Sequence, residues 1–168
     1  MVAETLSNSP LSLAAAHGLS KNLKVAHFKY EIAAQVEDGD IFQLGYIPKN
    51  SMVCGVVFSC DDIDTGTEAL DLDVGWADNG GGSATYVDPG TGVTYTNSGA
   101  SASAAGFVNS GVLTGDGLGE SHTGNQRIQF YPDPLYFSEK TMVQIEANVA
   151  ANSFTAGTAG VYVIYYVL

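Results

Sequence analysis

The sequence predicts an all-β protein: an antiparallel β-sandwich, jelly-roll-like, with an extended N-terminal arm. Three observations predict this class. Apolar and polar residues alternate with a period of two, no stretch of useful length has a helical period, and turn sequences separate the alternating segments. The chain has 168 residues, 45% of them hydrophobic, which is enough for the core of one domain. We expect residues 1–22 to form the arm and residues 23–168 a single sandwich domain.

Four segments alternate clearly enough to be predicted as strands with one face toward the core and one toward solvent. They are residues 25–34, 69–76, 127–131 and 142–149. In the second segment, Trp76 has the parity of the aliphatic residues and is predicted to lie in the core. Asp71 and Asp73 have the opposite parity, so both carboxylates are expected to face solvent.

Two other runs, residues 41–47 and 160–168, are apolar at both parities. Strands of this kind have to be covered on both faces, either by the rest of the domain or by a neighbouring subunit. The run 52–60 contains Cys54 and Cys60, which one continuous strand would hold about 20 Å apart. That separation excludes a disulfide unless the strand breaks, and we interpret both cysteines as small buried apolar residues.

Two segments have weaker patterns. Residues 1–22 are rich in Ser, Ala and Asn, and they are interpreted as an arm that becomes ordered against a partner or as a frayed terminus. Residues 77–125 are predicted to form long Gly-rich loops that carry two short strands, at 84–87 and 93–96. The Pro-Asp-Pro sequence at 132–134 is predicted to be a turn.

Charge is unevenly distributed along the chain. The 18 acidic and 6 basic residues give a net charge of −12, and no Lys or Arg occurs between Asn50 and Gln126. Such an acidic chain binds phosphate backbones and anionic membrane surfaces poorly, so neither nucleic acid nor a membrane is expected as a partner. The near-neutral flanks are the better candidates for contacts. Residues 1–19 have no Lys or Arg and only a short apolar stretch, which predicts no export signal and synthesis in the cytoplasm.

No motif predicts a catalytic residue, a metal site or a cofactor. The carboxylates between Asp61 and Asp73 lack the Gly and Glu positions of a calcium-binding loop, and the three histidines have no metal-ligand spacing. The sequence also has no nucleophile elbow. We therefore predict a protein that is not an enzyme. A carboxylate pair for glycoside hydrolysis stays open, because 18 acidic residues allow many pairs.

Aromatic residues leave a second function open. On a β-sandwich, five of them could form a platform on which sugars stack: Trp76, Tyr86, Tyr95, Tyr131 and Tyr136. The core parity of Trp76 weakens this interpretation. A glycan-binding module remains the alternative function.

Several sequence motifs are similar to those of small virion structural proteins from tailed bacteriophages. They are Val-Ala-His-Phe-Lys-Tyr at 25–30, the segment 40–50 that ends in Pro-Lys-Asn, Leu-Asp-Leu-Asp-Val-Gly-Trp at 70–76, and Ala-Gly-Val-Tyr-Val at 159–163. The family pattern has Gly after Pro-Lys, where this chain has Asn50. The resemblance covers residues 23–78 and 141–168 and does not extend to the middle of the chain.

This resemblance implies a capsid decoration (cement) protein or another accessory component, such as a head fibre, on the outside of the virion. Its partners would be the major capsid protein and sister copies, commonly in a homotrimer. In this chain the arm residues Leu6, Leu11 and Leu13 are then the expected capsid contacts. The oligomer contacts are expected on the last strand, at Tyr162, Ile164, Tyr166 and Leu168. In the alternative, the sandwich attaches a virion to a host glycan.

Overall fold

The computed structural model describes residues 23–61, 63–64, 69–108, 126–151 and 153–168. Within these residues the protein contains ten β-strands, one short 3-10 helix, η1 (Ser98–Ala100), and no α-helix. The strands are β1 (Leu23–Ile32), β2 (Ile41–Ile47), β3 (Ser51–Cys60), β4 (Asp71–Trp76), β5 (Thr85–Val87), β6 (Thr94–Thr96), β7 (Ser103–Val108), β8 (Gln126–Phe137), β9 (Thr141–Val149) and β10 (Gly157–Val167).

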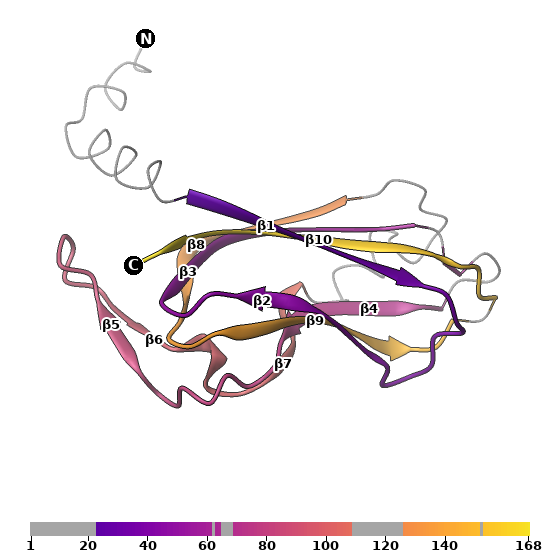
Figure 1. Ribbon diagram of the computed structural model, residues 1–168, viewed down its shortest axis with the longest axis horizontal. Helices are drawn as coiled ribbons and strands as arrows, with labels where there is room; N and C mark the ends of the chain where they lie inside the picture. Colours follow the sequence, from indigo (N-terminus) through magenta and orange to yellow (C-terminus); the bar gives the residue numbers. More distant parts are fainter. Residues whose placement is uncertain (1–22, 62, 65–68, 109–125, 152) are drawn as a thin grey trace, which may run out of the picture.

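Eight of the strands form two antiparallel sheets, in the orders β1-β10-β3-β8 (sheet A) and β2-β9-β4-β7 (sheet B). The first strand pairs with the last, the second with the one before it, and so on inward to β4 and β7. The chain is thus a long antiparallel ribbon that folds back through the β5–β6 hairpin, with successive pairs in alternate sheets. This is a jelly roll, so the predicted fold class is confirmed. Figure 1 shows the two layers, with the hairpin at the end where the C-terminus lies.

Side-chain contacts close both sides of the sandwich. On one side, the edge strands β1 and β2 meet, and the rings of Tyr30 and Phe42 lie 5.2 Å apart. Phe28 covers Gly45, where a Cβ atom would come within 2.6 Å of the ring, so this approach requires glycine. On the other side, the hydroxyl of Tyr131 in β8 donates a hydrogen bond to the carbonyl oxygen of Phe107 in β7.

One core fills the space between the sheets. Its fully buried side chains include Ile32, Ile47, Val56, Phe58, Val74, Val143, Ile145, Val161 and Val163. Trp76 is 6% exposed and makes edge-on contacts with Phe107 and Phe137. Its Nε1 donates to the carbonyl oxygens of Ser98 and Ser101, which satisfies the one polar atom of the indole. The predicted core position of Trp76 is confirmed.

The prediction of a turn at residues 132–134 is wrong, because this segment lies inside β8. The pairing of β3 with β8 jumps from Val53–Leu135 to Gly55–Phe130, so the prolines fall in a bulge of an edge strand. Proline has no N–H to donate, and bulges and sheet edges are the places where a strand tolerates it.

Two expectations for the middle of the chain also need correction. Asp73 is 5% exposed rather than solvent-facing, and its carboxylate accepts a hydrogen bond of 2.7 Å from the Asn148 side chain. Strand β4 lies inside sheet B, between β9 and β7, and it is buried at both parities. Strand β7 lies within the segment expected to form loops; the two short strands predicted there are present as β5 and β6.

Candidate interaction surface

The outer face of sheet A is the candidate functional surface, and strand alternation builds it. In β10, Val161, Val163 and Tyr165 point into the core, so the residues between them point outward. These outward residues are Tyr162, Ile164 and Tyr166. The pairing with β1 sets them directly opposite His27, Val25 and Leu23 in turn, which makes three cross-strand pairs on one face.

This outer face is apolar. Val25 is 60% exposed and Leu23 is 49% exposed, whereas Tyr162, Ile164 and Tyr166 are half-buried. Glu31 is the only carboxylate in β1, β3 and β10 together, although the chain as a whole has a net charge of −12. In these three strands, apolar outward residues with a single carboxylate, on such an acidic chain, are typical of a surface that contacts another molecule.

The middle of the face is ordered by a ring stack. The imidazole of His27 lies parallel to the Tyr162 ring, with centroids 4.0 Å apart and an angle of 2° between the planes. A shallow groove beside this stack is lined by His27, Lys29, Cys60, Asp61 and Tyr162, among others. The face thus passes from an aliphatic part at the start of β1 to a more polar part near the end of β1.

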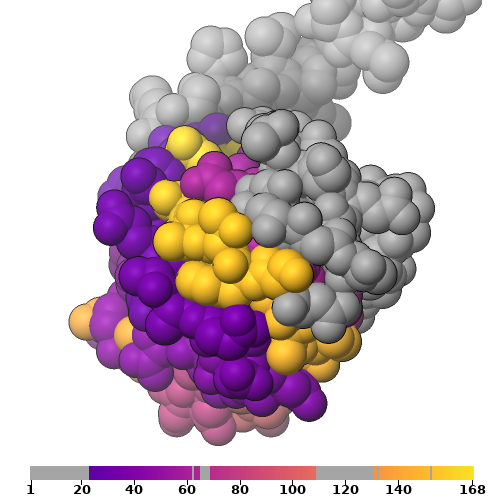
Figure 2. All heavy atoms as spheres, turned by 90° about the vertical axis from the view of Figure 1, so that its right-hand side faces the viewer, coloured from indigo at the N-terminus to yellow at the C-terminus, as the bar shows by residue number. Residues whose placement is uncertain are grey.

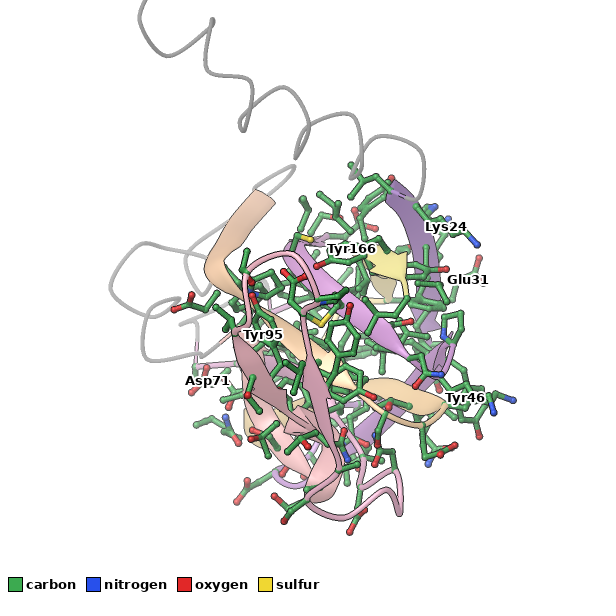
Figure 3. All side chains as sticks on the ribbon, turned by 90° about the vertical axis from the view of Figure 1, so that its left-hand side faces the viewer. Lys24, Glu31, Tyr46, Asp71, Tyr95 and Tyr166 are labelled. Atoms are coloured by element: carbon green, nitrogen blue, oxygen red, sulfur yellow. The ribbon has the colours of Figure 1, made fainter. Side chains whose placement is uncertain are left out.

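The β5–β6 hairpin borders the other end of the face. Tyr86 and Tyr95 face each other across the hairpin, and the Tyr86 ring lies 5.8 Å from that of Tyr136. Tyr166 lies close to this cluster. Burial raises the pKa of its hydroxyl to about 12, and the nearby Cys54, Tyr95, Asp88 and Tyr86 add to the increase. Figure 3 shows Tyr95 and Tyr166 at this end of the molecule. Met52, which lies between Tyr166 and Tyr136 in the sheet, is fully buried.

The structure brings three of the four predicted oligomer contacts together on this face: Tyr162, Ile164 and Tyr166. Leu168 lies just beyond β10, where its N–H donates to the carbonyl oxygen of Asn50, and it is 43% exposed. The predicted capsid contacts in the arm, Leu6, Leu11 and Leu13, lie outside the described residues.

Sequence reasoning missed the contribution of β1 to the face. Leu23 and Val25 have the parity of the polar residues His27, Lys29 and Glu31, so an alternation rule assigns them to a solvent-facing side. Their apolar character at that parity was the available signal. Only the pairing of β1 with β10 shows that they extend the apolar surface of the last strand.

The five aromatic residues considered for sugar stacking do not form one platform. Trp76 lies in the core, and Tyr131 is held under β7 by its hydrogen bond to Phe107. Tyr136 is 6% exposed, and its hydroxyl donates to the Asn50 side chain. The two that remain half-exposed are Tyr86 and Tyr95 of the hairpin.

Several of the described carboxylates, Asp61, Asp64 and Asp73 among them, accept hydrogen bonds from the protein itself. Asp64 is 5% exposed and accepts from the backbone N–H groups of Ala69, Leu70 and Ser153. In the described part of the chain, no group of three or more His, Cys, Asp or Glu residues could hold a metal ion. Neither cysteine forms a disulfide. A search of the same residues finds no helix with the length and hydropathy needed to cross a membrane.

Comparisons with known proteins identify the fold. No protein-family model and no curated protein matches the sequence. Among solved structures, a chain of the Cyanophage Pam1 capsid asymmetric unit is similar, with a TM-score of 0.59 and 20% identity over 88% of this chain and 86% of that chain. A chain in the capsid of Ralstonia phage GP4 has a TM-score of 0.55 and 16% identity over 88% of this chain and 85% of that one. The chain thus has a fold that occurs in phage capsid structures.

Proposed function

We propose that this chain is a virion structural protein that decorates the outer surface of a phage capsid as an oligomer and stabilises the shell. The observation that carries the proposal is the apolar outer face of sheet A on a jelly roll of the kind found in phage capsid structures. The sequence motifs shared with virion proteins of tailed phages support the same role.

The physical mechanism is added buried area. A protein that sits across the boundaries between capsid subunits buries apolar surface there, and each boundary then costs more free energy to open. The outer face of sheet A, with Tyr162, Ile164 and Tyr166, forms the contact between sister copies, which we propose to be three. The arm contacts the major capsid protein through Leu6, Leu11 and Leu13. The acidic remainder faces solvent on the outside of the particle and keeps particles apart by repulsion.

We propose that this role is not enzymatic. The supporting observation is that the buried carboxylates, Asp64 and Asp73, hold backbone or side-chain donors of the same chain. Carboxylates engaged in this way hold loops and strands in place, and their oxygens are already occupied by hydrogen bonds within the chain.

The test is binding to particles that lack the protein. Purified wild-type protein is expected to co-sediment with such particles and to raise the temperature at which they release their genome. Ile164→Glu puts a charge on the outer face of sheet A and is expected to weaken co-sedimentation at least about tenfold. Gln43→Glu, at an exposed position in sheet B, makes the same change of charge elsewhere and should bind as wild type. Wild-type protein that fails to co-sediment would rule out the decoration role.

The arm has its own experiment. A variant without residues 1–19 is expected to keep the sandwich fold, because the described core lies within residues 23–168. It should lose shell binding while its self-association is retained. Shell binding unchanged by the truncation would remove the arm from the proposed capsid contacts.

A glycan-binding role is the second candidate, and the tyrosine cluster favours it. Tyr86 and Tyr95 are half-exposed, lie next to each other and border Tyr166, an arrangement on which sugar rings can stack. A glycan array should then show micromolar or tighter binding that Tyr86→Ala and Tyr95→Ala each abolish. A glycan array without such binding would reject the glycan-binding role and leave decoration as the one proposed function.

A further inference from the structure

The jelly roll converts the uneven charge of the sequence into two halves of different charge. Strands β1, β10, β2 and β9 lie together on one side of the two sheets, and they come from the near-neutral flanks of the chain. We call these strands and their connecting turns the flank half. Strands β3, β8, β4 and β7, together with the β5–β6 hairpin, form the acidic half. Figure 2 shows the surface of β1 and β2 beside that of the last part of the chain at one end of the sandwich.

All four described lysines belong to the flank half. Lys24 and Lys29 are in β1, Lys49 is in the turn after β2, and Lys140 is in the turn before β9. The ammonium of Lys140 lies 3.9 Å from the centroid of the Tyr46 ring, and Tyr46 is 49% exposed. Figure 3 shows Lys24 and Tyr46 on the same side of this end of the molecule.

The acidic half is more negative. The flank half carries six described carboxylates beside its four lysines, whereas Arg127 in β8 is the one basic residue in the described part of the acidic half. From residue 51 to residue 126 it contains no Lys or Arg, and exposed or partly exposed carboxylates lie at Asp78, Asp88 and Asp133. It also carries apolar surface, because Val87 and Val93 beside the hairpin turn are 55% and 46% exposed. An isolated two-stranded hairpin is marginally stable in water, so further cover on this hairpin would stabilise it.

We infer that in the oligomer the apolar outer face of sheet A, with Lys29 on it and Lys24 at its edge strand, is covered by the acidic half of the next copy. This inference rests on the proposed function and names the surface that the sister copy supplies. It brings Leu23 and Val25 against Val87 and Val93, and lysines against carboxylates. Pairing two identical faces instead would gather four lysines, Lys24 and Lys29 of each copy, around only two carboxylates, Glu31 of each copy. Like charges in an interface cost free energy.

The contact is therefore heterologous, because two different surfaces of the chain meet. Contacts of this type close into a ring when the rotation between copies fits, as it does in a trimer. A trimer built in this way has no two-fold axis and uses both halves of every copy. The charge asymmetry then sets the direction in which the copies follow one another around the ring.

The first experiment is zero-length carbodiimide cross-linking, which joins a lysine amine to a carboxylate only where the two are in contact. A mixture of unlabelled and ¹⁵N-labelled protein is cross-linked in solution and on particles, and mass spectrometry identifies the links between copies. We expect links from Lys24 or Lys29 to Asp78, Asp88 or Asp133. Links between copies that join Lys29 to Glu31, or none between copies in either sample, would overturn the inference.

The second experiment is a charge swap read by sedimentation. Lys24→Glu with Lys29→Glu is expected to weaken self-association at least tenfold, and so is Asp78→Lys with Asp133→Lys. The four changes together should restore it to within about threefold of wild type, because the attraction is reversed but kept. Asp133→Lys alone serves if the Asp78 variant folds poorly, since Asp78 also accepts a hydrogen bond from Gly80 N. Asp38→Lys, in the exposed turn after β1, is the matched control and should associate normally.

The outcomes separate this inference from the proposed function. Copies that bind particles without any link between them would overturn the inference and keep the decoration role. Rings that form in solution but do not bind particles would keep the inference and overturn the decoration role. A charge swap that fails to restore association, with every variant folded, would also overturn the inference.

Discussion

The hydroxyl of Tyr131 donates a hydrogen bond of 2.6 Å to the carbonyl oxygen of Phe107, and this bond joins the edge strand of sheet A to the edge strand of sheet B. The two sheets have no other described side-chain hydrogen bond between β7 and β8. On the opposite side, rings rather than hydrogen bonds hold β1 to β2. The sandwich is therefore closed by a polar tie on one side and an aromatic contact on the other.

Alkaline pH should destabilise the protein through this tyrosine. Burial raises the pKa of Tyr131 above its usual value of 10, because the ionised form cannot be solvated under β7. Tyr131 ionises near pH 10 in the unfolded chain and only at higher pH in the folded chain, so its contribution to stability is constant below pH 10 and falls above it. Thermal melts of the wild type between pH 8 and 11 should show this fall.

Tyr131→Phe removes the ionisable group and the hydrogen bond together. At pH 8 we expect a loss of about 1–2 kcal/mol, because the Phe107 carbonyl is left without its donor. Above pH 10 the decline should be shallower than in wild type, although Tyr166, whose pKa is raised to about 12, still contributes. Equal slopes for the two proteins would contradict this assignment.

Neighbouring residues of β10 should respond in opposite ways to the same substitution. Val163 is fully buried, so Val163→Ala should cost about 2 kcal/mol of unfolding free energy and leave self-association unchanged. Ile164 points outward, so Ile164→Ala should cost less than about 1 kcal/mol and weaken self-association. Chemical denaturation and analytical ultracentrifugation measure the two effects. Equal losses of stability would mean that Ile164 is a core residue.

Much of the fold can be predicted from the two-residue period of the apolar residues and from the turn sequences between the strands. The alternation in β1, β4 and β9, the short strands β5 and β6, and the core position of Trp76 can all be predicted because a strand exposes its two faces to different surroundings. The rule fails in β4, which is buried at both parities. Asp73 keeps the polar parity of β4 and is nevertheless buried, because Asn148 of sheet B satisfies its carboxylate.

Only half of the candidate surface can be predicted from the sequence, because the other half depends on which strand pairs with β10. Tyr162, Ile164 and Tyr166 stand out because β10 is apolar at both parities. Leu23 and Val25 join them only because β1 pairs with a strand more than a hundred residues away. Likewise, the local sequence around the prolines of β8 predicts a turn. The strand continues through them only because it bulges opposite Cys54.

The base of the β5–β6 hairpin should depend on one buried amide. Asn97 is 3% exposed, its side chain donates to Gly82 O and Asn79 Oδ1, and its own Oδ1 accepts from the backbone N–H groups of Gly99 and Ser138. Asn97→Ala leaves these groups without partners and should cost about 2–4 kcal/mol. Asn97→Asp keeps the acceptor but sets a buried carboxylate oxygen against the Gly82 carbonyl oxygen, so it should cost at least as much as Asn97→Ala. Urea unfolding measures both, and an Ala variant within about 0.5 kcal/mol of wild type would contradict the role of this network.

Cys54 offers a chemical probe of the outer face of sheet A. Burial raises the pKa of its thiol, so less thiolate is present at neutral pH than for an exposed cysteine. In a Cys60→Ser background, alkylation of the monomer at pH 8 should be at least about threefold slower than that of a small free thiol. Cys54 lies beside Tyr166, so covering the face in the oligomer should slow the reaction further. Mass spectrometry of the alkylated protein at low and high concentration measures both rates. A Cys54 that reacts equally fast in monomer and oligomer would show that the contact between copies leaves this end of the face open.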